Sequence, residues 1–195
     1  QLAFSNPHAN GTFITLKSQG NVTITSSASP AIEASSLGAA GGTSDTTGNN
    51  GMAAVITLNA GLGATGTPGA AGGAAALYPG TVVAKIINCG TGSGGGGGRG
   101  PSGTEGATGG RGGGVLIIEC FALLNFTGTI NAKGAVGGTA SSRGGGGGGG
   151  AGGTVVILYN QLTANTGTIS VLGGNGSAGA NGVGAGGGGG GGGGG

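Results

Sequence analysis

Residues 97–112 read GGRGPSGTEGATGGRG, and glycine recurs in this stretch at every third position from Gly97 to Gly112. Residues 63–72 and 173–182 carry the same spacing. Side chains repeat at about 3.6 residues in an α-helix and at about 2 in a β-strand, so a period of three fits neither. It fits an extended helix of the polyproline II type, in which glycine on one edge lets another backbone approach closely. The stretch therefore predicts glycine-rich helices packed side by side, and a scaffold rather than a catalyst.

The composition departs strongly from that of an average protein. Of the 195 residues, 59 are glycine, six are basic and four are acidic, whereas average usage is about 7% glycine and about 25% charged residues. The net charge of +2 is too small to bind a nucleic-acid backbone strongly, so we expect no nucleic-acid partner. Aromatic residues make up 3%, too few for base-stacking platforms or sugar-binding aromatic shelves.

Sparse charge also bears on association and order. A small protein usually relies on a mixed charged surface to stay apart from its copies, so this chain is predicted to assemble or to present a large neutral face. A glycine-rich composition is typical of disordered chains. Against that, the mean hydropathy is +0.23 and the apolar residues gather in short β-branched runs. We therefore expect an ordered chain.

Two similar units follow one another in the second half of the sequence. Val115–Ile118 aligns with Thr154–Ile157, and Gly128–Ile130 aligns with Gly167–Ile169, both with an offset of 39 residues. Each unit reads as an apolar strand, a short polar turn, a second strand and a glycine-rich excursion. Periods of 20–50 residues are typical of stacked repeat architectures.

The whole chain, residues 1–195, is therefore predicted to be one repeat-built domain. The clearer units are residues 115–153 and 154–195, and looser strand units lie within residues 1–93. Four further strands are predicted in the looser part: Phe13–Lys17, Val22–Thr25, Ala54–Leu58 and Thr81–Ile87.

The strands are predicted to differ in burial. Phe13–Lys17 and Val22–Thr25 alternate with threonine, which indicates one solvent-exposed face. Val115–Ile118 and Val155–Leu158 are continuously apolar, which indicates cover on both faces. The predicted fold class is all-β with polyglycine II helices, in which stacked strand–turn–strand repeats lie beside a layer of glycine-rich extended helices. Collagen is excluded, because it needs a long unbroken register and about 15–20% proline.

Residues able to carry chemistry are few and scattered. His8 is the one histidine and has no cluster of ligand-type residues beside it, so we expect no metal site. The acids Glu33, Asp45, Glu105 and Glu119 are not paired at short spacing. Glu119 interrupts an apolar strand and is expected to pair with a basic residue on an adjacent strand. We therefore predict no catalytic residues, no cofactor and no enzymatic activity.

Two kinds of covalent modification are candidates. Cys89 and Cys120 could form a disulfide in an oxidising compartment or remain two buried thiols, and spacing alone leaves both open. Asn10 and Asn175 each begin an Asn-x-Ser/Thr triplet in a turn-like context, so they are candidate glycosylation sites if the source cell glycosylates exported proteins.

Short strand pairs that alternate with glycine runs such as Gly144–Gly153 resemble the distal adhesins of T-even-type phage tail fibres. That resemblance implies polyglycine II helices and receptor-binding loops between glycine motifs. The Gly-X-Y runs are similar to snow-flea-type antifreeze proteins, which are small polyglycine II bundles. The combination of strands and glycine also resembles repetitive bacterial and archaeal surface proteins.

These observations lead to one principal functional expectation and two alternatives. We expect a structural subunit of an extracellular filament or surface assembly, built from copies of itself. The alternatives are a phage-type tail-fibre adhesin that binds a cell-surface receptor or glycan, and an ice-binding protein. The chain is expected to be secreted, on a cell surface or on a virion. No apolar run reaches 18 residues, so no membrane span is expected.

Overall fold

The computed structural model describes residues 1–25, 30–43, 106–140 and 144–179. These residues contain no helix, and about 41% of them lie in strands. The strands are β1 (Leu2–Ala3), β2 (Phe13–Ser18), β3 (Val22–Ile24), β4 (Ile32–Glu33), β5 (Val115–Phe126), β6 (Thr129–Asn131), β7 (Thr154–Asn165) and β8 (Thr168–Ser170). The predicted strands at Ala54–Leu58 and Thr81–Ile87 lie outside the described residues.

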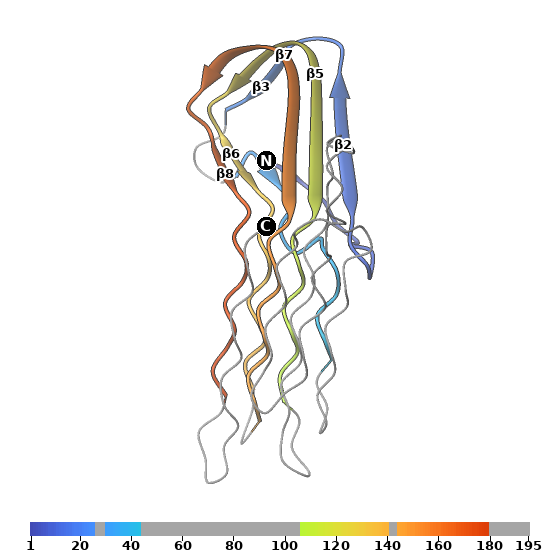
Figure 1. Ribbon diagram of the computed structural model, residues 1–195, viewed down its shortest axis with the longest axis vertical. Coiled ribbons are helices and arrows are strands. Elements are labelled where there is room, and N and C mark those ends of the chain that lie inside the picture. Colours follow the sequence, from blue (N-terminus) through green and yellow to red (C-terminus); the bar gives the residue numbers. More distant parts are fainter. Residues whose placement is uncertain (26–29, 44–105, 141–143, 180–195) are drawn as a thin grey trace, which may run out of the picture.

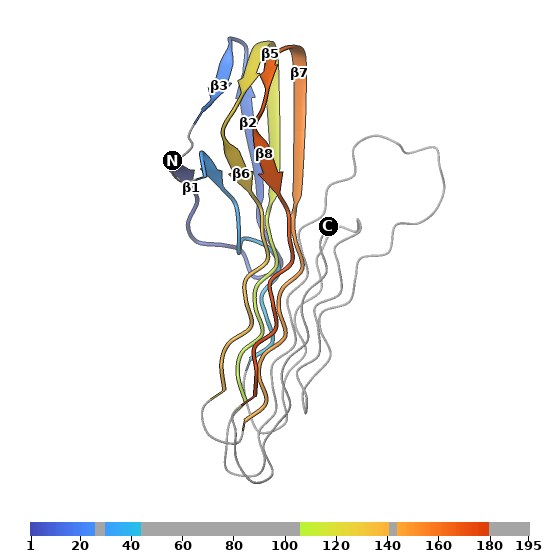
Figure 2. The same cartoon turned by 90° about the vertical axis from the view of Figure 1, so that its left-hand side faces the viewer.

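The strands form two sheets, and every strand pair in them is parallel. The long sheet contains β2, β3, β5 and β7, with β5 at its centre. The first half of β5 pairs with β2, and the last three residues of β5 pair with β3. The short sheet has the order β1-β4-β6-β8. Figure 1 shows β2, β5 and β7 side by side, and Figure 2 shows β1 at the outer side of the short sheet.

The strands stack in three layers within the described part of the chain. The first layer holds β2, β3 and β4, the second holds β5 and β6, and the third holds β7 and β8. Val115 pairs with Thr154 and Thr129 pairs with Thr168, so the residues aligned by the 39-residue offset are neighbours in space. In the first layer β2 pairs with β5, and Phe13 lies beside Val115. The 39-residue offset did not predict this pairing, because the two residues are much farther apart in sequence.

The core lies between the two sheets. Alternate residues of β5 point into it, and Leu116, Ile118 and Leu124 are almost fully buried. Ile14 and Ile24 come from the first layer and Ile130 from the short sheet. Residues in successive layers therefore form aliphatic columns, such as Leu16–Ile118–Ile157. Burial of these side chains contributes about 1.5–3 kcal/mol each to folding.

Glycine-rich segments adjoin the strands and run side by side away from the sheets (Figure 1). Their N–H groups bond across to neighbouring segments at every third residue. Ala107, Gly110 and Gly113 donate to the carbonyl oxygens of residues 145, 148 and 151. Residues 144–150 are buried throughout. Because glycine has no side chain, only such backbone contact can offset the entropy lost when it is ordered.

The predicted layer of polyglycine II helices beside the strands is wrong. The described residues hold no helix, and their regular structure is strands in parallel sheets. The physical reason is that each glycine-rich segment directly precedes or follows a paired strand, as at residues 106–114 and 171–179. Its direction and its neighbours are therefore set by the sheets. Residues 63–72, 97–105 and 180–182 of the period-three stretches lie outside the described part.

The burial predictions for individual strands had mixed outcomes. The strand β2 alternates as expected, with Ile14 buried between exposed neighbours. Within β5, Val115, Leu116 and Ile118 are buried. The expectation of cover on both faces is wrong for β7, where Leu158 is exposed. The reason is that Leu158 lies beside Glu119 in the long sheet, on the face that is turned away from the core.

Candidate interaction surfaces

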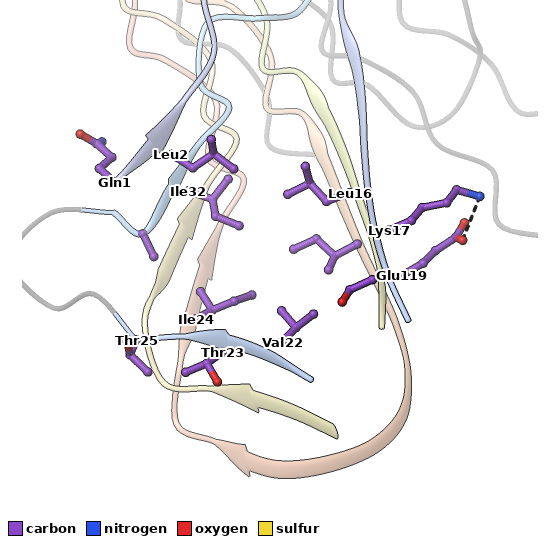
Figure 3. A pocket seen from close by; sticks show the side chains of 13 residues that line it. Gln1, Leu2, Leu16, Lys17, Val22, Thr23, Ile24, Thr25, Ile32 and Glu119 are labelled. Atoms are coloured by element: carbon purple, nitrogen blue, oxygen red, sulfur yellow. Dashed lines mark ion pairs between the residues drawn. The ribbon is translucent and has the colours of Figure 1, made fainter. Parts of the chain in front are cut away.

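A groove opens between the two sheets at the first layer (Figure 3). Its volume is about 370 Å³. Leu16, Val22 and Ile24 line it from the long sheet, and Leu2 and Ile32 line it from the short sheet. These side chains point into the space between the sheets in Figure 3. The groove is therefore the open end of the apolar core.

An ion pair lies behind the groove, on the other face of the long sheet. Lys17 Nζ is 3.0 Å from Glu119 Oε2, and both side chains point away from the groove in Figure 3. The predicted pairing of Glu119 with a basic residue on an adjacent strand is confirmed. Because the Lys17 side chain is 63% exposed, water and salt screen the pair, and it contributes at most about 1 kcal/mol.

A second hollow of about 400 Å³ lies over β5 and β7. Phe121, Leu158 and Tyr159 line it together with Glu119 and Asn160. Phe121 is 65% exposed and Tyr159 is 49% exposed. We call these five residues the corner patch, because they lie near the irregular register between β5 and β7. Exposed aromatic side chains that gather in this way are typical of interaction sites.

The third layer presents a further apolar surface. Among the described strands, β7 pairs with β5 alone and β8 pairs with β6 alone. Ile169 of β8 is 43% exposed, and Leu172, just after β8, is 64% exposed. A parallel strand with an unpaired edge is a template for another strand. The third layer is therefore a candidate surface for pairing.

Arg111 fastens the N-terminal loop to the glycine-rich segments. Its Nη2 donates to the carbonyl oxygens of His8 (2.6 Å) and Gly38 (2.9 Å). Burial lowers the pKa of the Arg111 guanidinium below its usual value, because a charged group loses hydration there. Hydrogen bonds from a charged donor are stronger than neutral ones. Arg111 therefore acts as a structural anchor.

The structure describes one of the two cysteines. Cys120 is a free, buried thiol, whose Sγ lies 3.4 Å from the Leu123 carbonyl oxygen. Cys89 lies outside the described residues. The disulfide between Cys89 and Cys120 thus stays a prediction.

The two candidate glycosylation sites differ in exposure. Asn10 is half-buried and forms a backbone bridge with Ala39. Asn175 is exposed on a glycine-rich segment, and its carbonyl oxygen accepts from the Gly137 N–H at 2.9 Å. Ser177, the third residue of that triplet, donates its hydroxyl to the Gly137 carbonyl oxygen. Asn175 is therefore the more accessible of the two side chains.

The other chemistry-bearing residues are dispersed in the described part of the chain. His8 Nδ1 accepts from the Asn10 N–H, and Glu33 accepts from the Asn131 side chain at 3.3 Å. Asp45 and Glu105 lie outside the described residues. Within the described ranges, no three residues of the types His, Cys, Asp or Glu are grouped so that they could hold a metal ion. The same ranges contain no helix of a length and hydropathy suited to crossing a membrane.

Sequence reasoning missed the groove and the Arg111 anchor. The groove depends on Leu2, in a strand of two residues that carries no periodic signal. The alternation of Phe13–Lys17 indicated that Leu16 and its neighbours point to opposite faces of a strand. It did not indicate that this strand lies at the end of the stack and lines a groove. Comparison of the chain with protein-family models, with curated proteins and with solved structures finds no match.

Proposed function

We propose that the chain is a structural subunit of an extracellular assembly, a filament or a surface layer, built from copies of itself. The observation that carries the proposal is the pair of open strand edges at the two ends of the described stack. Both outer layers have strand edges with which no other described strand pairs. They also carry exposed apolar side chains, including Leu2 and Phe13 at one end and Ile169 and Leu172 at the other. Repeat proteins need terminal units with a polar outer face to remain monomeric.

The charge pattern supports the same proposal. The whole chain has ten charged residues and a net charge of +2, so electrostatic repulsion between copies is weak. The glycine-rich part adds backbone groups already ordered by hydrogen bonds. Strand edges that are already ordered by hydrogen bonds lose little conformational entropy when they pair with another copy.

The test is to purify the full chain and to measure its assembly over a range of concentrations. Sedimentation velocity should show species that grow with concentration, and electron microscopy should show filaments or sheets. Contacts between copies should bury more than about 2,000 Å², as in obligate interfaces. A monomer that persists at high concentration, with no ordered polymer, would refute the proposal.

A receptor-binding adhesin is the second candidate, and the corner patch favours it. Phe121 and Tyr159 are exposed over a hollow that also holds the polar side chain of Asn160. Replacement of Phe121 by serine should abolish binding to a target cell surface if this patch contacts a receptor. Replacement of Thr127, an exposed turn residue, is the matched control. Equal binding by both variants would exclude the patch.

A further inference from the structure

The groove at the first layer is a space one strand wide. On the short sheet, β1 extends the stack one strand beyond β4. On the long sheet, β2 and β3 are the last described strands on that side. Leu2 of β1 therefore points across the groove toward Leu16 and Val22 (Figure 3). No described strand of the long sheet lies at the same level as β1.

The strands of the third layer could pair with those of the first layer in the way that the described layers pair with one another. In the described stack each layer adds to the next by parallel pairing with aliphatic residues in register, as in Leu16–Ile118 and Ile118–Ile157. A strand β7 placed beside the edge of β2 that no described strand pairs with would repeat this pairing and set Ile157 next to Leu16. Its partly buried neighbour Val155 would fill the groove beside Ile14.

We propose that copies of the chain stack head to tail, with the third layer of one copy closing the groove at the first layer of the next. This inference rests on the proposed function and specifies the surfaces that the copies use. The occupant is a second copy because every copy carries both surfaces, and because the new junction continues the parallel pairing that already joins the layers. A contact between two different surfaces leaves an end free at each step, so it generates a filament when its rotation does not close a ring.

The same geometry gives β1 a role as a removable cap. In the third layer β7 and β8 lie at the same level, since they pair with β5 and β6 of one unit. A β7 that pairs with β2 therefore brings its β8 to the outer edge of β4. That edge is held by β1, which has only two residues, both exposed. Stacking thus requires β1 to leave, and β1 opposes assembly because its displacement from the place of β8 costs free energy.

Three kinds of variant test the proposal, one deletion and two kinds of substitution. Deletion of residues 1–5 removes β1 and should lower the concentration needed for assembly about tenfold, the change given by about 1.4 kcal/mol. Leu16→Lys places a charge in the groove at the first layer. Ile169→Lys and, independently, Leu172→Lys place a charge on the third layer at side chains that are already exposed. Thr127→Lys is the control for added charge, and melting curves of dilute protein establish that each variant is folded.

Head-to-tail stacking predicts that each end variant alone forms no filament. A mixture of Leu16→Lys with either third-layer variant should give dimers only, because one intact end of each kind remains.

Dimers of a single end variant would show that like surfaces pair and would overturn the proposal. Filaments of normal length from the end variants would also overturn it while leaving the proposed function standing. Absence of assembly in the unmodified chain and in the deletion variant would overturn both. A deletion variant that assembles more weakly than the unmodified chain would overturn the role of β1.

Discussion

At Gly147 the lack of a side chain is a requirement of packing. Its N–H donates to the Gly138 carbonyl oxygen at 3.0 Å, and its own carbonyl oxygen accepts from Ser177 at 3.0 Å. A Cβ added at Gly147 would overlap the carbonyl oxygen of Thr108, whereas one added at Gly20 would meet nothing within 4 Å. Backbone on a neighbouring segment cannot move aside as a flexible side chain can.

We therefore predict that Gly147→Ala lowers the free energy of unfolding by about 1–3 kcal/mol or more, as overpacking does. Gly20→Ala, the same chemical change in open space, should alter it by no more than about 0.5 kcal/mol. Thermal melting of both variants is the measurement. Equal losses would show that the crowding around Gly147 is not what limits substitution.

Replacement of Arg111 should also lower the free energy of unfolding, because Arg111 joins the glycine-rich segments to the N-terminal loop. Arg111→Met keeps an apolar stem but removes the donor to the His8 and Gly38 carbonyl oxygens. Loss of these partners should cost about 1–3 kcal/mol. Lys133→Met, on a neighbouring glycine-rich segment, removes one positive charge as well and serves as the control. Urea denaturation should separate the two, and a control that loses as much stability would assign the effect to net charge.

The glycine period shows what the sequence can predict at this scale. Three-residue spacing predicted glycine where backbones approach closely, but the crowded Gly110 and Gly113 each lie one position after the glycines of the predicted period, Gly109 and Gly112. It was wrong about helices, because the same spacing serves hydrogen bonds between segments that adjoin paired strands. The partners of Arg111 were beyond prediction, since both are backbone carbonyl oxygens far away in sequence.

At the scale of the element, β5 contributes most to the core, and two adjacent residues of β5 differ in burial because they point to opposite faces. Ile118 is 2% exposed and packs between the sheets, while Ile117 is half-buried on the other face. Ile118→Ala should destabilise the fold by about 2–5 kcal/mol through a cavity between the layers. Ile117→Ala should cost clearly less. Chemical denaturation of the pair measures the difference, and a reversed order would contradict the assignment of the inner face.

Strand existence was predictable where apolar and β-branched residues were dense. The regions of β2, β3, β5 and β7 were all indicated by such runs. The lengths of β5 and β7 were not, because each continues through a register shift where the sequence indicated a turn. The strands β1 and β4 have two residues each and exist only because a neighbouring strand pairs with them. Hence the groove, which needs Leu2 and Ile32, could not be predicted.

At the scale of the whole molecule, the surfaces proposed to join copies are apolar and backbone-rich. The one ion pair given by the described residues, Lys17 with Glu119, lies within a copy and faces away from the groove. Salt acts on charged contacts through screening, whereas burial of apolar surface persists at high ionic strength and weakens on cooling. Assembly should therefore be insensitive to NaCl between about 0.05 and about 1 M, concentrations at which the Debye length falls from more than 10 Å to about 3 Å. It should also recede when the temperature is lowered. Light scattering across both series is the measurement, and dissolution by salt would show that charges outside these surfaces hold the copies together.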